Sequence, residues 1–81
     1  MFRKRIKATE IEVDGHRYEV HYFEQKTVRG SRRFSCEVMI DATDRIIVDD
    51  DSMTSLESKV ERLAPATVYS RLLAGRPSVA A

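Results

Sequence analysis

A stretch of eight residues before the middle of the chain combines four cations with a single glycine. This stretch, KTVRGSRR, spans residues 26–33, and a second basic segment, FRKRIK, follows the first methionine. Clustered lysine and arginine side chains neutralise the phosphates of a nucleic-acid backbone, so both segments are candidates for phosphate contacts. The candidate residues are Arg3, Lys4, Arg5, Lys26, Arg29, Arg32 and Arg33.

The same charges also suit the solvated end of a β-hairpin that binds nothing. A surface that holds nucleic-acid bases needs exposed aromatic rings beside the cations. Strand alternation places Tyr18, Tyr22 and Phe34 on the buried side of a sheet, which leaves Phe2 and Phe23 for that role. Both interpretations of the basic stretch therefore stay open.

Carboxylates gather in the run Asp49-Asp50-Asp51, where a divalent cation would find oxygen ligands. Calcium loops alternate their ligands and need a central glycine, and this run has neither feature. Acidic residues ahead of a helix also favour its N-terminus, and we expect that role here. His16 and His21 point to opposite faces of one strand, and one cysteine with two histidines is too few for the common zinc sites. The sequence predicts no metal and no other cofactor.

No part of the sequence has the spacing of a catalytic motif. A nucleophile elbow, a phosphate-binding loop and a dinucleotide fingerprint are all missing. Cys36 lies between Phe34 and Val38 in an alternating run, which predicts a small, inert core residue. We therefore expect a protein without enzymatic activity and without a small-molecule substrate.

The elements that would position these residues begin with a hairpin around Asp14 and Gly15. Asp-Gly between two alternating runs predicts a two-residue turn, because both turn residues adopt positive φ. This turn sets Val13 opposite His16 and fixes every further pair. One face is then apolar and buried, and it collects Ile11, Val13, Tyr18, Val20 and Tyr22. The other face is mainly charged and collects Glu10, Glu12, Arg17, Glu19 and His21.

Two more strands follow in the sequence. Residues 33–41 alternate, and with Tyr22 opposite Cys36 they leave residues 26–32 as the connecting loop. A turn at residues 41–44 leads into RIIVD. A three-residue loop there buries Ile46 and Val48 and exposes Ile47, whereas a two-residue loop does the reverse. We prefer the first, because it buries two β-branched residues.

The remainder of the chain has helical spacing. Ser52, or Thr54 with Glu57, suits the start of a helix. The apolar positions of the first part are Met53, Leu56, Val60 and Leu63, and those of the second part are Tyr69, Leu72 and Leu73. Pro65 is expected to kink the helix or to split it in two. Gly75 suits its C-terminal cap, and residues 76–81 are expected to fray.

These elements predict an α+β fold. It is a single domain over residues 1–81, with a four-stranded antiparallel β-meander and a C-terminal helix packed on one sheet face. This order of elements resembles the Whirly-type single-stranded-DNA-binding architecture at the level of the fold, and a fold does not fix a function.

One helix layer covers only one face of such a sheet, so the other face is open to water or to a partner. Three of its residues, Phe23, Met39 and Ile47, form a predicted interaction face. Ile6 and Ala8 also fall there, unless the first strand has a bulge near Thr9. The leading hypothesis is a non-catalytic module that binds another protein or forms a homodimer, and the alternative is nucleic-acid binding.

Composition bounds these hypotheses only loosely. The net charge is +1, with a basic N-terminal part and an acidic middle, so no partner follows from charge alone. A single cysteine allows no internal disulfide, and the longest aliphatic run, IIV, is far too short to span a membrane. We expect a cytoplasmic protein with no membrane partner.

Overall fold

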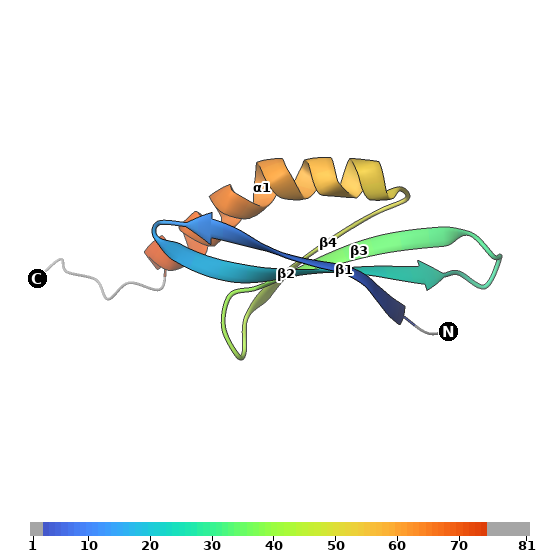
Figure 1. The fold of residues 1–81 in the computed structure, drawn as a ribbon, viewed down its shortest axis with the longest axis horizontal. Helices are drawn as coiled ribbons and strands as arrows, with labels where there is room; N and C mark the ends of the chain where they lie inside the picture. The colour runs from blue at the N-terminus through green and yellow to red at the C-terminus, as the bar shows by residue number, and fades with distance from the viewer. Residues whose placement is uncertain (1–2, 75–81) are drawn as a thin grey trace, which may run out of the picture.

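Four strands follow one another along the chain and pair in sequence order to form one antiparallel sheet (Figure 1). The computed structural model describes residues 3–74. The strands are β1 (Arg3–Val13), β2 (His16–Lys26), β3 (Arg32–Met39) and β4 (Arg45–Asp50), and the helix α1 (Met53–Ala74) follows them. This arrangement confirms the predicted meander with a C-terminal helix on one face. Phe2, Gly75 and the tail 76–81 lie outside the described residues.

The first hairpin has the predicted turn and register. Asp14 and Gly15 both have positive φ, 53° and 81°, and Val13 pairs with His16. The bulge lies at Ile6, closer to the N-terminus than the predicted position near Thr9. Because the extra residue falls between Arg5 and Lys7, the register shifts there and places Lys7 opposite Tyr22 on the helix side of the sheet.

The second connection is tighter than predicted. Lys26 pairs with Arg32, so the loop covers residues 27–31 instead of 26–32. The Thr27 backbone N–H donates to the Ser31 carbonyl over 2.8 Å, and the Gly30 N–H donates to the Thr27 carbonyl over 2.9 Å. Gly30 has a φ of 82°, a conformation that glycine adopts without steric cost. These bonds give the hairpin end a defined shape.

The third connection has the preferred three-residue loop. The Ile40 N–H donates to the Asp44 carbonyl over 3.0 Å, which leaves residues 41–43 as the loop. The Asp41 carboxylate accepts bonds from the Thr43 N–H and hydroxyl and from the Asp44 N–H. These bonds stabilise the ionised carboxylate and hold the pKa of Asp41 below its ordinary value. The register buries Ile46 and turns Ile47 outward, as predicted.

The core lies between the sheet and one side of α1, which contacts β1, β3 and β4. The helix buries Leu56, Val60, Ala64 and Val68, a regular spacing of four. The predicted inward position of Leu63 is wrong, because its side chain is 45 % exposed. Because the helix is unbroken, the next buried residue after Val60 is Ala64 and not Leu63. Leu63 therefore lies at the flank of the helix, beside its contact with the sheet.

The helix is continuous through Pro65. Of the two predicted alternatives, the split is therefore wrong, and the structure has the kink. Figure 1 shows the helix axis bending downward in its orange half. Proline removes one backbone donor and crowds the preceding turn, which bends a helix. Ser52 caps the start of the helix, because its Oγ accepts a bond from the Ser55 N–H over 3.2 Å.

Candidate nucleic-acid interface

The end of the β2–β3 hairpin projects beyond the rest of the sheet. Pairing of β1 with β2 starts at Arg3 and Gln25, and pairing of β3 with β4 ends at Phe34 and Asp50. Among residues 3–74, the segment 26–32 therefore projects without a third strand, and we define it as the hairpin tip: the pair Lys26 and Arg32 with the loop 27–31 between them. Figure 1 shows this tip at one end of the molecule, past the start of α1, whereas the C-terminal half of α1 lies at the opposite end.

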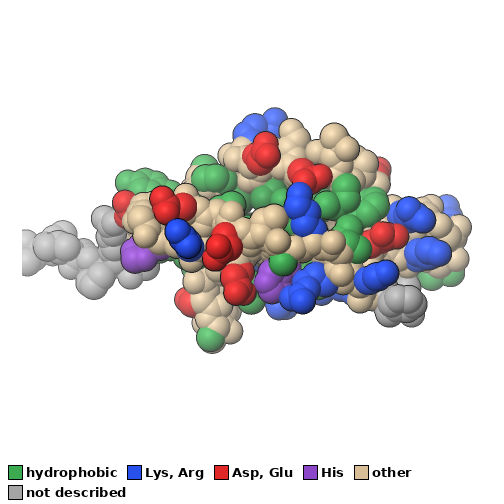
Figure 2. Space-filling model, viewed as in Figure 1, with side chains coloured by type: hydrophobic (Ala, Val, Ile, Leu, Met, Phe, Trp, Pro, Cys, Tyr) green, Lys and Arg blue, Asp and Glu red, His purple; other side chains and the backbone are tan. Residues whose placement is uncertain are grey.

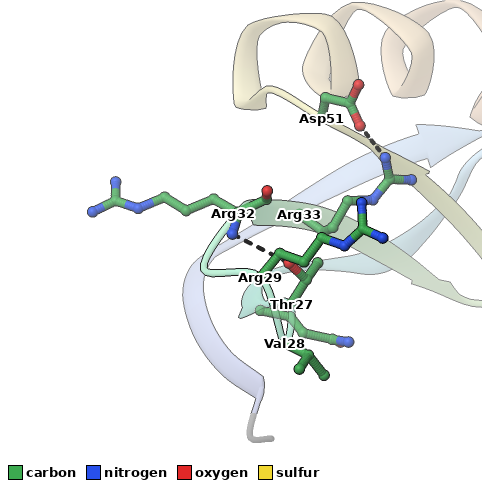
Figure 3. Close-up of a pocket in the computed structure, with 8 residues that line it drawn as sticks. Thr27, Val28, Arg29, Arg32, Arg33 and Asp51 are labelled. Atoms are coloured by element: carbon green, nitrogen blue, oxygen red, sulfur yellow. Dashed lines mark hydrogen bonds and ion pairs between the residues drawn. The ribbon is translucent and has the colours of Figure 1, made fainter.

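One side of the hairpin tip is hollowed. A hollow of about 660 Å³ is lined by Gln25, Thr27, Val28, Arg29, Ser31, Arg32, Arg33 and Asp51. Figure 3 shows the Arg29 and Arg33 side chains extending in the same direction, with Arg33 held by Asp51, while the Arg32 side chain extends the opposite way. The loop therefore presents guanidinium groups on two sides.

A second hollow shares Arg32 with the first. Its volume is about 320 Å³, and it is lined by Lys4, Glu24, Lys26 and Arg32. Strand alternation and register place these four side chains on the helix side of the sheet, and place Arg33 on the other side. Lys4, Lys26 and Arg32 therefore lie on the helix side of the hairpin, and Arg33, at the base of the tip, lies on the open side.

The predicted phosphate contacts divide into paired and unpaired cations. Arg33 forms ion pairs with Asp51 and Asp49, and Arg32 lies 3.4 Å from Glu24. Arg3 pairs with Glu37 on the open sheet face. Within residues 3–74, no ion pair forms at Lys4, Arg5, Lys26 or Arg29. Figure 2 shows the resulting concentration of lysine and arginine side chains over this end of the molecule.

The aromatic rings near these cations are covered. Tyr22 is buried and Phe34 is half-buried against the core. The guanidinium carbon of Arg3 lies 3.9 Å from the centre of the Phe23 ring, so one face of that ring is occupied. In the described part of the chain, this end of the molecule therefore has charge without an exposed stacking surface.

The predicted interaction face on the open side of the sheet is divided by charge. Ile47 is 58 % exposed, while Phe23 and Met39 are half-buried. Glu37 lies among them and is only 6 % exposed, because Arg3 and Arg45 both pair with its carboxylate, Arg45 over 3.3 Å. The three predicted residues share one face but do not form a continuous apolar patch.

An apolar surface that the sequence interpretation missed lies on the outer side of α1. Tyr69 and Leu73 were expected to face the sheet, yet each is 46 % exposed. With Leu63 and Ala66 they fall within about 120° of arc at 3.6 residues per turn. We name these four residues the outer helix stripe. Its signal in the sequence is a second apolar line, offset from the buried spacing of four.

The acidic run forms ion pairs around the start of α1. Asp50 lies 3.0 Å from the Lys59 ammonium group, and that hydrogen bond is the largest cause lowering the Asp50 pKa. Asp51 pairs with Arg33 and thereby connects the helix start to the hairpin. Across the described residues, no three histidine, cysteine or acidic side chains converge as metal ligands.

Cys36 points inward, as predicted, and is fully buried. Burial is the main reason that its pKa rises to about 12, and the charge of Glu37 adds to the rise. The thiol therefore stays protonated at neutral pH, and a protonated thiol is a poor nucleophile.

Fold and site together define a small α+β domain with a cationic hairpin tip. No family model, curated protein or solved structure matches this chain. Within the described residues, no helix combines the length and apolar character that a membrane span requires.

Proposed function

We propose that the protein is a non-catalytic nucleic-acid-binding module that uses the hairpin tip. The observation that supports this proposal is the set of cations on the hairpin tip and at its base. Four of them, Lys4, Arg5, Lys26 and Arg29, form no ion pair within residues 3–74. Such cations gain the most from neutralising phosphates, because they have no internal carboxylate to give up. We place this activity in the cytoplasm, which suits a protein with one free thiol.

The paired arginines assist the unpaired ones. Asp51 fixes the Arg33 side chain along one wall of the larger hollow, where Arg29 also lies. A fixed arginine loses less conformational freedom when it contacts a phosphate, and its planar group can donate two bonds to one phosphate. Arg33 therefore acts as a positioned donor, and Arg29 as a donor that no carboxylate of residues 3–74 holds.

Replacing two exposed arginines of the tip is expected to weaken binding. In the Arg29→Ala/Arg32→Ala variant, affinity for a mixed-sequence oligonucleotide should fall about tenfold at low salt, and the salt slope should shrink by about two. Fluorescence anisotropy across a salt series measures both quantities. The control is Arg17→Ala/Arg62→Ala, which removes the same charge from exposed positions away from the tip. Equal losses in the two variants would show that only net charge matters.

A second candidate function is self-association, and the outer helix stripe favours it. A helix with apolar residues on both sides is usually covered on both sides. The buried side of α1 faces the sheet, while Tyr69 and Leu73 remain exposed on the other side and Leu63 remains exposed on the flank between the two sides. A second copy presents the same stripe, so a two-fold contact between helices would cover both surfaces at once. Ile47 on the open sheet face offers the competing contact surface.

Charge placed on the stripe is expected to reduce the mass of any assembly. In this reading the wild-type protein has about twice its 9.3 kDa chain mass, and Tyr69→Lys/Leu73→Lys is a monomer. Static light scattering at several concentrations measures the mass. Ser58→Lys, at an exposed position earlier in α1, is the control for added charge. A monomer produced by Ile47→Lys instead would assign the contact to the open sheet face.

A further inference from the structure

We infer that the nucleic acid bound by the hairpin tip is double-stranded DNA, with the tip inserted into the major groove. This inference rests on the proposed function and specifies its ligand. It comes from the shape of the tip, the distribution of charge over its two faces, and the residue at its end.

The shape of the tip fits a groove. Residues 26–32 consist of one paired position, Lys26 with Arg32, closed by the loop 27–31, and among residues 3–74 no third strand pairs with them. The major groove of B-form DNA is about 12 Å wide and admits a two-stranded ribbon. The corresponding groove of an RNA duplex is deep and too narrow for side chains to enter, so DNA is the better fit.

The charges fit the two walls of a groove. Phosphates line both rims of the major groove, so an inserted ribbon meets them on both of its faces. Lys26 and Arg32 lie on one face of the ribbon, and Arg33 lies at the base of the other. Figure 3 shows the Arg32 and Arg33 side chains diverging in this way. A surface adapted to one flat strand would need cations on one face only.

The end of the tip carries an apolar side chain. Val28 is 92 % exposed, more than any other large apolar residue in the described chain. The floor of the major groove presents the methyl group of thymine, and apolar side chains contact this group. The minor groove presents no such methyl group. Val28 is therefore positioned to meet thymine methyl groups when the arginines contact the phosphates.

The covered aromatic rings argue against a single strand as the ligand. Proteins that bind single strands stack the bases on exposed rings, and this stacking contributes much of their affinity. Near the tip, Tyr22 is buried, and Arg3 covers one face of Phe23. From residues 3–74, a single strand would thus gain mainly phosphate contacts, whereas a duplex gains contacts along both rims.

The test compares three ligands of equal length with the whole protein. A duplex of about 20 base pairs, roughly two helical turns, is titrated beside one of its strands and the matching RNA duplex. Fluorescence anisotropy at low salt is expected to show the DNA duplex binding about tenfold more tightly than either competitor. Equal or tighter binding of the single strand or of the RNA duplex would overturn the inference.

A second titration locates the groove. Replacing thymine by uracil in the DNA duplex removes only the major-groove methyl groups. The wild-type protein is expected to lose about fourfold in affinity per contacted methyl, and Val28→Ala is expected to lose much less. A wild-type affinity that does not change with uracil would overturn the placement of the tip in the major groove.

These outcomes are separable from failure of the proposed function. If no oligonucleotide binds, or if Arg29→Ala/Arg32→Ala binds as the wild type does, the hairpin tip is not a nucleic-acid site at all. If binding depends on the two arginines but the single strand is preferred, the function stands and only the duplex inference fails.

Discussion

Between pH 9 and pH 11 the folded protein is expected to lose on the order of 3 kcal/mol of stability, because two buried acids resist ionisation. Burial raises the pKa of the Cys36 thiol from 9.0 to about 12. Burial also raises the pKa of the Tyr22 hydroxyl from 10.0 to about 12, with the charges of Cys36, Glu57 and Glu61 adding to the rise. Both side chains are almost completely buried.

The direction follows from the proton balance. In the unfolded chain, both groups release their protons near their ordinary pKa values, while in the folded chain they keep them. Unfolding therefore releases protons above pH 9, so stability is complete below that pH and declines as the pH rises toward 12. Each group contributes about 1.4 kcal/mol per pH unit within its own window.

Urea unfolding at pH 8, 9, 10 and 11 measures this decline. The control variant is Cys36→Ala, which removes the thiol, so that its decline should begin about one pH unit later, when Tyr22 starts to titrate. A free energy of unfolding that stays constant from pH 8 to pH 11 would show that both groups ionise freely in the folded state.

Leu56→Ala is expected to lower the free energy of unfolding by about 3 kcal/mol. Leu56 has no exposed surface and is the largest fully buried side chain of the described core. Its loss removes apolar contacts between α1 and the sheet and leaves a cavity. A domain of this size has a total stability of only about 4–12 kcal/mol, so the variant would be partly unfolded at modest urea concentrations.

The matched control is Leu63→Ala in the same helix. Leu63 is 45 % exposed, so the same substitution should cost less than about 1 kcal/mol. Equilibrium urea unfolding followed by circular dichroism at 222 nm, the usual helix signal, gives both values. Equal midpoints for the two variants would contradict the orientation of α1 on the sheet.

The sheet was predictable because its signals are local. Asp14 and Gly15 fix one turn, and from there the period of two assigns each residue of the first two strands to a face. The same alternation set Tyr22 opposite Cys36 and thus located the hairpin tip. The bulge at Ile6 was misplaced, since no residue type near it requires that position.

The helix was less predictable, because Pro65 has two opposing effects. Local propensity favours a break there, and the sequence interpretation left both a kink and a split open. Continuing the helix instead buries Ala64 and Val68 against the sheet, and the carbonyl that loses its donor belongs to Glu61, on an exposed turn where water can reach it. Tertiary packing therefore outweighed the local preference for a break. Because the helix continues, Leu63 and the residues after Pro65 share one helical periodicity and align as the outer helix stripe.

At the candidate site, the sequence located the cations but not their partners. The charge cluster is visible in the residues alone. Which cations are neutralised depends on contacts between distant segments, such as Arg33 with Asp51 and Arg3 with Glu37. Such pairs form only once the strands and the helix are assembled, so no local pattern indicates them.

The hairpin tip lies at one end of the molecule, and the C-terminal half of α1, which carries Ala66, Tyr69 and Leu73 of the outer helix stripe, lies at the other end (Figure 1). Occupying one surface leaves the other free, so the two candidate functions are compatible. Two chains joined through their stripes would carry two tips on one particle. Once one tip is bound, the other searches the same DNA molecule at a high effective concentration, and avidity increases without any new contact. A weak single hairpin would then suffice for firm attachment to long DNA, though not to a fragment that holds only one tip.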